Sequence, residues 1–398
     1  MVRCVSALAP RCRLMVRRGG SAPERRFAPA CRYTAPGWYA EQVGTIAGGS
    51  LDGVISLEDF ESLAMEGMSP AAYGYVAGGA WDEISLRESV EAWRRFRFLP
   101  RVLRDVRTVD VSGTFLGRQA ALPIAIAPTA AQGLAHPNAE AEMVAGAAAA
   151  AIPHILSTTS SVPLEAVAAA APDAERWFQL YIVGGMAYSR GLVERAEAAG
   201  YRAIVLTVDL PVLGRRERDV RLGFEMPALA HIDAVEDEHD SRYGALADPL
   251  KAGLTWQSLD EIRSWSSLPL VVKGILAPAD ALRAVDAGVD AIVVSAHGGR
   301  QLDRVIATAD ALRPVVDAVD GRCEVWVDGG IRRGLDVVVA LCLGADGVLV
   351  GRPFYWALAA AGRAGVERAA SIMRAELELA LPLLGCTSIG ELGPELLA

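Results

Sequence analysis

The stretch Glu324–Pro353, "EVWVDGGIRRGLDVVVALCLGADGVLVGRP", contains the pattern that decides the fold. A short apolar run ends in a glycine turn, a helical pattern follows over Gly334–Leu343, and a second apolar run ends in Gly351 and Arg352. Apolar runs with little alternation are typical of strands buried on both faces. A helix between two of them predicts a right-handed crossover between parallel strands.

The same pattern recurs from residue 120 to residue 385. Eight apolar runs are present: "LPIAIA" (122–127), "IPHILS" (152–157), "WFQLYI" (177–182), "AIVLTV" (203–208), "LPLVVKG" (268–274), "AIVVSA" (291–296), "EVWVDGG" (324–330) and "GVLVGR" (347–352). Pro278–Ala287 supplies another helical pattern between two runs. Eight such units favour an α/β fold, a (β/α)₈ TIM barrel over residues 120–385, over an open doubly wound sheet.

Three segments lie outside this pattern. Residues 51–118 are expected to form short helices that cap one end of the barrel. Residues 219–260, after the fourth strand, are longer than an ordinary connection, and we expect a lid loop there. Residues 1–50 are expected to be a basic, disordered extension that precedes one catalytic domain over residues 51–398.

The charge of the chain is unevenly distributed. Residues 1–40 contain eight arginines and one acidic residue, although the whole chain has a net charge of −9. The acidic remainder argues against a nucleic-acid partner. A transit peptide is one interpretation of the basic head; a disordered tail or a start codon placed too early is favoured, because the head shows no apolar block and no helical stripe.

Neither a membrane span nor a metal site is expected. The longest apolar runs are shorter than the roughly 18 residues that a spanning helix needs. The six cysteines show no C-x-x-C spacing, which indicates neither a metal ligand set nor a redox pair and favours a cytoplasmic location.

Polar residues, together with glycines and one proline, follow the apolar runs, at the end where barrels of this type place their active sites. They are Pro128 and Thr129, Ser157, Gln179 and Tyr181, Thr207 and Asp209, Lys273, Ser295, His297 and Arg300, Asp328 to Gly330, Arg332, Gly351 and Arg352. Taken singly, each is more simply explained as a strand cap or a satisfied core group. Their common position at one end of eight runs favours a shared site.

The last two turns predict a phosphate-bearing cofactor. "VDGGIRRG" and "LVGRP" place glycines and arginines after strands seven and eight, where barrels commonly bind phosphate on backbone N–H groups. Lys273 is one of only two lysines and ends an almost wholly apolar strand. A Schiff-base lysine, a plain strand-end charge and a cation beside a flavin all remain open for it.

His297 precedes a glycine pair, with Arg300 three residues further on. A core histidine with both nitrogens satisfied is the usual role of a lone His. The alternative is a general base near neutral pH, with Asp209 stabilising the imidazolium that forms.

The motif S-x-H-G-G-R-Q-L-D around His297, together with "APTA", "FQLY", "TVDLPVLGRRERD", "VVKGIL" and "DGGIRRG", resembles the FMN-dependent 2-hydroxy-acid oxidase and dehydrogenase family. The match runs from about residue 55 to residue 385. The resemblance implies a barrel that binds FMN and oxidises an (S)-2-hydroxy acid to the 2-oxo acid, with O₂ reduced to H₂O₂. It also implies a homo-oligomer, a tetramer or an octamer.

The same resemblance implies roles for individual residues. His297 would be the base, supported by Asp209, with Tyr181 near the substrate hydroxyl and Lys273 stabilising the reduced flavin. The residues implied to bind the substrate carboxylate are Tyr75, Arg216 and Arg300. Those implied for FMN are Pro128, Thr129, Ala130, Ser157, Gln179, Thr207, Lys273 and Ser295 along the ring and ribityl chain, and Asp328, Gly329, Gly330, Arg332, Gly351 and Arg352 at the phosphate.

Two positions depart from the family pattern. Ala296 stands where the family often has Asn, and Thr159 stands where glycolate oxidase has a bulky aromatic residue. The smaller Thr159 favours a larger substrate, such as mandelate or 4-hydroxymandelate, as in the bacterial hydroxymandelate oxidases. Lactate or glycolate oxidase, a dehydrogenase with a quinone or protein acceptor, a non-catalytic FMN-binding member and a flavin-free phosphate-binding lyase or isomerase are the alternatives.

Overall fold

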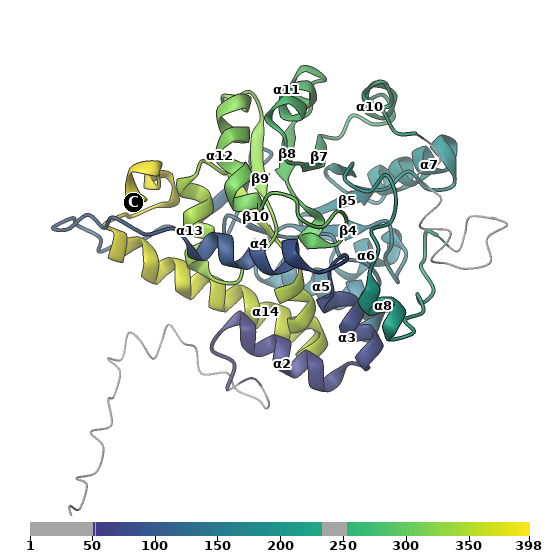
Figure 1. Cartoon of the computed structure of the whole chain (residues 1–398), viewed down its shortest axis with the longest axis horizontal. Coiled ribbons are helices and arrows are strands. Elements are labelled where there is room, and N and C mark those ends of the chain that lie inside the picture. Colours follow the sequence, from purple (N-terminus) through teal and green to yellow (C-terminus); the bar gives the residue numbers. More distant parts are fainter. Residues whose placement is uncertain (1–50, 52, 233–252) are drawn as a thin grey trace, which may run out of the picture. The chain divides into compact units, whose positions relative to one another are not determined.

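A computed structural model of the chain describes residues 51, 53–232 and 253–398, within the compact unit Ile46–Ala398. Eight parallel strands close into a barrel in the order β10-β3-β4-β5-β6-β7-β8-β9, with β10 paired to β3. Helices surround the labelled strands in Figure 1. The strands are β3 (Ile124–Ile126), β4 (His154–Ser157), β5 (Arg176–Leu180), β6 (Ile204–Thr207), β7 (Leu270–Ile275), β8 (Ala291–Val294), β9 (Glu324–Val327) and β10 (Gly347–Val350). The predicted (β/α)₈ barrel is confirmed, because each strand lies within or beside its apolar run.

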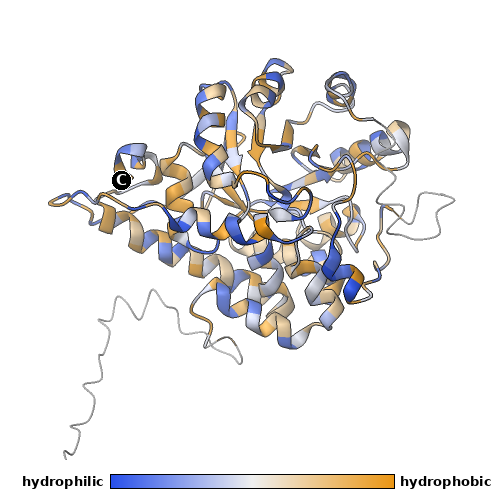
Figure 2. Ribbon diagram, viewed as in Figure 1, coloured by the Kyte–Doolittle hydropathy of each residue, from blue (hydrophilic) through white to orange (hydrophobic). Residues whose placement is uncertain are grey.

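Helices follow the strands and cover the outside of the barrel. They are α5 (Ala139–Ala149), α6 (Leu164–Ala170), α7 (Gly185–Ala198), α10 (Trp256–Arg263), α11 (Pro278–Asp286), α12 (Thr308–Val319), α13 (Gly334–Cys342) and α14 (Arg352–Leu384). The strands are coloured mostly as hydrophobic, whereas the surrounding helices alternate hydrophobic and hydrophilic residues (Figure 2). This difference follows from burial, since the strands are covered on both faces and each helix on one.

Aromatic side chains fill the barrel interior at the end where the strands begin. Trp177 and Trp326 stack with ring centroids 5.0 Å apart. Phe115 packs edge-on against both rings, and it comes from a hairpin formed by β1 (Gly113–Phe115) and β2 (Arg118–Ala120). A Cβ at Gly347, the first residue of β10, would lie 2.4 Å from the Phe115 ring. The hairpin therefore closes the barrel opposite the predicted site; only helices were predicted in this part of the chain.

Three helices precede the barrel: α2 (Leu57–Gly67), α3 (Pro70–Ala77) and α4 (Ile84–Arg94). The amino end of α4 is fixed by Asp303, which accepts hydrogen bonds from the N–H groups of Ile84 and Ser85. The other end of α4 is fixed by Trp93, whose indole N–H donates to the carbonyl of Gly329 at 2.8 Å. The helix thus lies over the turns that follow β8 and β9, whereas α2 packs along α14.

The predicted lid, residues 219–260, is only partly described. Its first residues belong to the helix α8 (Glu217–Arg221), and its last belong to α10. Residues 222–232 form a connection in which Leu229, His231 and Ile232 are buried. Residues 233–252 lie outside the described part of the chain. The expected basic extension at residues 1–50 lies outside it too. In the described part, none of the helices combines the length and apolar character needed to cross a membrane.

Candidate active site

A cleft opens at the carboxyl ends of the barrel strands, and most of the predicted site residues line it. These are Tyr75, Pro128, Thr129, Ala130, Ser157, Thr159, Tyr181, Thr207, Arg216, Lys273, His297, Arg300, Asp328, Gly329, Gly330, Arg332, Gly351 and Arg352. Gln179, Asp209 and Ser295 stand behind this surface and bond to residues that line it. The structure therefore brings together residues that lie more than 270 positions apart in the sequence.

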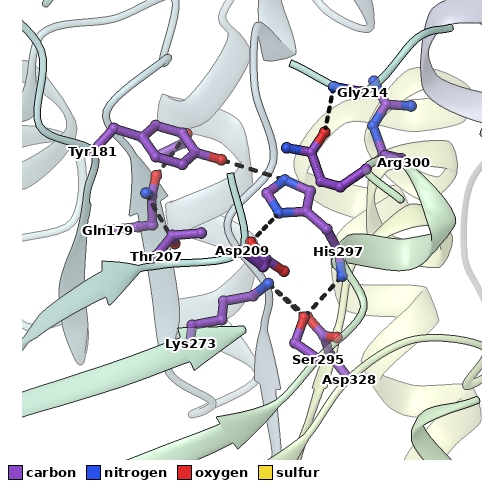
Figure 3. Close-up of polar contacts among 12 residues, drawn as sticks. Gln179, Tyr181, Thr207, Asp209, Gly214, Lys273, Ser295, His297, Arg300 and Asp328 are labelled. Atoms are coloured by element: carbon purple, nitrogen blue, oxygen red, sulfur yellow. Dashed lines mark hydrogen bonds and ion pairs between the residues drawn. The ribbon is translucent and has the colours of Figure 1, made fainter. Parts of the chain in front are cut away.

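His297 is held between two side chains (Figure 3). Its Nδ1 lies 2.8 Å from Oδ1 of Asp209, and its Nε2 lies 3.3 Å from the hydroxyl of Tyr181. The backbone N–H of His297 donates to the hydroxyl of Ser295 at 3.1 Å. With a φ of 53°, His297 begins a turn of three residues with positive φ. A Cβ at Gly299 would lie 2.6 Å from the Leu86 nitrogen, so the turn needs glycine there.

The protonation state of His297 follows from its surroundings. Burial lowers the pKa of its imidazole, and Asp209 opposes this only in part. Burial also opposes the charge on Asp209, but His297 and Lys273 hold the pKa of that carboxyl below its usual value. Burial raises the pKa of Tyr181, which therefore keeps its proton. The neutral imidazole thus donates from Nδ1 to Asp209 and presents its Nε2 lone pair to the cleft.

Lys273 is a buried cation at the end of β7. Its ammonium group donates to the hydroxyl of Ser295 at 2.8 Å and forms an ion pair with Asp328 at 3.1 Å. Burial works against the charge, but Asp328 and Asp209 hold the pKa of Lys273 above its ordinary value. A Schiff-base lysine must be neutral to attack a carbonyl, so this arrangement favours a fixed positive charge.

The two predicted carboxylate-binding arginines share one aromatic ring. The guanidinium carbon of Arg300 lies 4.7 Å from the ring centroid of Tyr75, and that of Arg216 lies 5.9 Å from it. Arg300 donates to the carbonyl of Gly78 at 3.0 Å, and Arg216 donates to Oε1 of Gln301 at 3.4 Å. This part of the cleft is therefore strongly positive.

Hydrogen bonds link the ends of three neighbouring strands. Ser157 of β4 donates to Oε1 of Gln179 of β5 at 3.1 Å, and Nε2 of Gln179 donates to the hydroxyl of Thr207 of β6 at 3.1 Å. Thr159 extends the chain, with its hydroxyl 2.8 Å from that of Ser157. These bonds fix the orientation of the polar side chains along this side of the cleft.

The turn after β9 contains two glycines, and the turn after β10 contains Arg352. Gly329 and Gly330 have φ values of 88° and 80°, and a Cβ at Gly330 would lie 1.9 Å from the Ser89 carbonyl oxygen. Arg352 donates to three backbone carbonyls, those of Val76, Gly298 and Gly78. Two of its five N–H groups have no partner among the residues that the structure describes and are available to an anion. Arg352 therefore both joins these loops and lines the cleft.

The comparison with known proteins identifies the family. The model of the FMN-dependent dehydrogenase family matches residues 64–398. The chain belongs to this family. It is 45% identical over 351 residues to an L-lactate oxidase of Nostoc sp., covering 85% of this chain and 96% of that one. It is 46% identical over 344 residues to a 4-hydroxymandelate oxidase of Amycolatopsis orientalis, covering 84% and 96%. The crystal structure of a mandelate oxidase with (S)-4-hydroxymandelic acid matches with a TM-score of 0.81 and 44% identity, covering 86% of this chain and 98% of that one.

The cleft fits the FMN that this family uses. It holds about 1180 Å³ of space not occupied by protein atoms, part of it open to solvent. Backbone N–H groups at glycine turns and two arginines suit a phosphate, and Lys273 suits the electron-rich edge of a flavin ring. Oδ1 of Asp328 is buried without a hydrogen-bond partner among the described residues, which leaves an acceptor for a hydroxyl of the cofactor.

Some functional residues of this family member were not singled out from the sequence. Gln301 accepts from the N–H of Gly214 and from Arg216, and its position inside the S-x-H-G-G-R-Q-L-D motif was an available signal. Glu140 is buried and accepts from the N–H groups of Gln132 and Ser161, which joins the loops after β3 and β4. No local pattern indicates this bond. Nothing in the structure explains the alanine at position 296.

Proposed function

We propose that the protein oxidises an (S)-2-hydroxy acid with an apolar side chain to the 2-oxo acid, and that O₂ is reduced to H₂O₂. The observation that carries the proposal is the neutral His297, held by Asp209 and Tyr181, beside the positive group formed by Arg216 and Arg300. A base and a carboxylate site within one cleft are what this reaction requires.

The positive group would bind the substrate carboxylate. Arginine matches a carboxylate with two parallel N–H donors, and two arginines around Tyr75 restrict the carboxylate to one orientation. This orientation holds the substrate's hydroxyl-bearing carbon toward His297. Fixing the reacting groups in this way supplies a large part of a rate enhancement.

His297 would remove a proton from the bound substrate through Nε2. Asp209, 2.8 Å from Nδ1, then stabilises the imidazolium. The Tyr181 hydroxyl, which stays protonated, would donate to the substrate oxygen. FMN, when bound, accepts the two electrons that leave the substrate carbon.

The cofactor would be held along the whole length of the cleft. The ring side is assigned to Pro128, Thr129, Ala130, Ser157, Thr207 and Lys273, and the phosphate side to Asp328, Gly329, Gly330, Arg332, Gly351 and Arg352. Gln179 and Ser295 stand behind the ring side and would act through their bonds to Thr207 and Lys273. Lys273 contributes a positive charge that stays in place at neutral pH because of Asp328.

An aryl substrate is the preferred assignment. Besides Thr159, the cleft is lined by Leu210, Leu213 and Met226, which offer apolar surface. Relatives named 4-hydroxymandelate oxidase and mandelate oxidase support mandelate or 4-hydroxymandelate. The relative named L-lactate oxidase makes lactate the second candidate.

Bleaching of bound FMN without oxygen tests the proposal. The purified protein is mixed anaerobically with glycolate, lactate, mandelate or 4-hydroxymandelate, and the flavin absorbance is followed. We expect the aryl acids to bleach FMN fastest and air to restore the colour with one H₂O₂ per substrate. No bleaching by any of the four acids would refute the proposal; bleaching without recovery in air would replace the oxidase by a dehydrogenase with another acceptor.

We also propose a catalytic domain over residues 51–398, a homo-oligomer of four or eight chains, and a cytoplasmic location. The domain proposal is supported by the family match over residues 64–398, and the location by three described cysteines that are free. A chain truncated to residues 51–398 should retain FMN and activity.

Light scattering of the full chain should give four or eight times the monomer mass of 42.1 kDa, and a single monomer mass would contradict the oligomer.

A further inference from the structure

The segment 222–232, between α8 and the undescribed residues, contributes side chains to the substrate side of the cleft. Met226 lines the cleft, and the ring of Phe224 stacks on that of Tyr75 with centroids 4.3 Å apart and an interplanar angle of 11°. The position of this segment therefore affects how much space a substrate side chain finds.

His231 anchors the far end of the segment. Its side chain is fully buried, and Nε2 lies 3.1 Å from the backbone nitrogen of Leu164. Nδ1 lies 3.1 Å from the carbonyl oxygen of Thr158 and 3.3 Å from the hydroxyl of Ser160. A backbone N–H can only donate, so Nε2 is the acceptor and the single ring proton lies on Nδ1. One neutral tautomer therefore satisfies both bonds.

The backbone around His231 is fixed as well. The N–H of Ala230 donates to the carbonyl of Ser160 at 2.9 Å, and the hydroxyl of Tyr188 on α7 donates to the carbonyl of His231 at 3.0 Å. The ring of Phe178 on β5 packs edge-on against the imidazole, with centroids 5.8 Å apart. His231 is thus held on three sides, and its own contacts join the segment to the loop after β4.

That loop is part of the active site. Thr158, the partner of His231, lies between Ser157 and Thr159, which both line the cleft. The hydroxyl of Thr158 also accepts the backbone N–H of Tyr181 at 3.0 Å. The imidazole therefore bonds to Thr158, whose two neighbours in the chain line the cleft.

We propose that His231 is a positioning residue for the substrate's side chain. Its imidazole ties the segment that carries Phe224 and Met226 to the loop that carries Thr159, and so sets the width of the cleft between them. Only four residues separate Met226 from His231, so a displaced anchor moves Met226. This role rests on the proposed function, since it concerns the side chain of a bound 2-hydroxy acid.

The anchor also responds to pH. Burial lowers the pKa of His231; Arg195 of α7 lowers it further, whereas the Thr158 carbonyl and Glu165 of α6 oppose this. Arg195 and Glu165 are themselves an ion pair at 2.7 Å. Protonation would place an N–H on Nε2 opposite the N–H of Leu164. The anchor is therefore intact at neutral pH and is lost as the pH falls through the lowered pKa.

Two substitutions at His231 test the anchor in the full-length, FMN-loaded protein. His231→Leu removes both bonds, and His231→Gln offers an acceptor near the Nε2 position. His154→Leu is the matched control, because His154 is a buried histidine at the other end of β4 with no hydrogen-bond partner among the described residues.

The anaerobic bleaching rate is measured at increasing concentrations of two substrates. One is glycolate, and the other is the larger 2-hydroxy acid that bleaches the FMN of the wild type fastest. We expect His231→Leu, which removes both bonds, to raise half-saturation for the larger acid about tenfold. A net effect on binding equal to one hydrogen bond corresponds to roughly that factor. The maximal rate and the glycolate value should change less than about twofold. His231→Gln should restore most of the affinity. It should also lack the rise in half-saturation that we expect of the wild type at acid pH.

Unchanged half-saturation in His231→Leu would overturn the proposal while leaving the proposed function intact. An equal rise for glycolate, or the same rise in His154→Leu, would also overturn it, because either result indicates general destabilisation. A wild type that no 2-hydroxy acid bleaches would refute the proposed function, and this role with it.

Discussion

Replacing Asp209 by Asn tests the charge beside His297 with little change in shape. Asparagine keeps an oxygen that accepts the hydrogen bond from Nδ1 at the position of Oδ1, 2.8 Å away in the structure. The negative charge is lost, so the substitution separates electrostatic stabilisation of the imidazolium from orientation of the ring.

The size of the effect follows from the distance. Two unit charges 2.8 Å apart attract each other by about 6 kcal/mol at an effective dielectric constant of about 20. This is an upper bound, because a buried pair gives up hydration; hydrogen bonds to charged groups contribute about 1.5–3 kcal/mol net. We therefore expect flavin bleaching at saturating substrate to slow by about 10- to 150-fold.

The pH dependence supplies a second readout. Asp209 is the main group that raises the pKa of His297 against burial, so its loss lowers that pKa further. Because His297 acts in its neutral form, the acid limb of the bleaching rate should move to lower pH in Asp209→Asn. The assay is anaerobic stopped-flow absorbance from about pH 5 to pH 9.

Asp346→Asn is the control for this experiment. Asp346 accepts the N–H of Val325 at 2.7 Å, at the end of the barrel where the strands begin. Its substitution should leave the bleaching rate and the acid limb unchanged. Wild-type rates and an unshifted acid limb in Asp209→Asn would refute the assigned role of Asp209.

Three more substitutions test other parts of the structure. Lys273→Met leaves the buried Asp328 without its cation. It should lower the free energy of unfolding by about 3–5 kcal/mol, measured with urea. A loss below about 1 kcal/mol would mean that the ion pair is not coupled in the folded protein. Thr159→Trp should narrow the cleft and lower kcat/KM for mandelate at least about tenfold relative to glycolate, and an equal loss for both acids would contradict a steric role. Phe115→Ala opens a cavity beneath Trp177 and Trp326 and should cost about 3–5 kcal/mol by calorimetry while leaving KM unchanged.

The barrel was predictable because its signals are local. Each strand, such as β9, is an apolar run buried on both faces. The turns after β8 and β9 have glycines at positions with positive φ: Gly298, Gly299, Gly329 and Gly330. The hairpin that carries Phe115 was missed, because three-residue strands leave too short a pattern to distinguish from a loop.

The site was predictable as a set of residues, because parallel strands place all their carboxyl ends at one end of a barrel. The contacts of Arg352 with Val76, Gly78 and Gly298 were not predictable, since they join segments far apart in the sequence. The same holds for Glu140 and for His231, whose partners lie on other loops.

By itself, the sequence determined the eight-fold repeat, the end of the barrel that carries the chemistry, and the residue types available there. Only the tertiary structure decided the charge states on which the chemistry depends: a neutral His297, an ionised Asp209 and a charged Lys273. The physical reason is that a pKa reflects burial and the distances between charges, and those distances exist only after β6, β7, β8 and β9 have closed around one cleft.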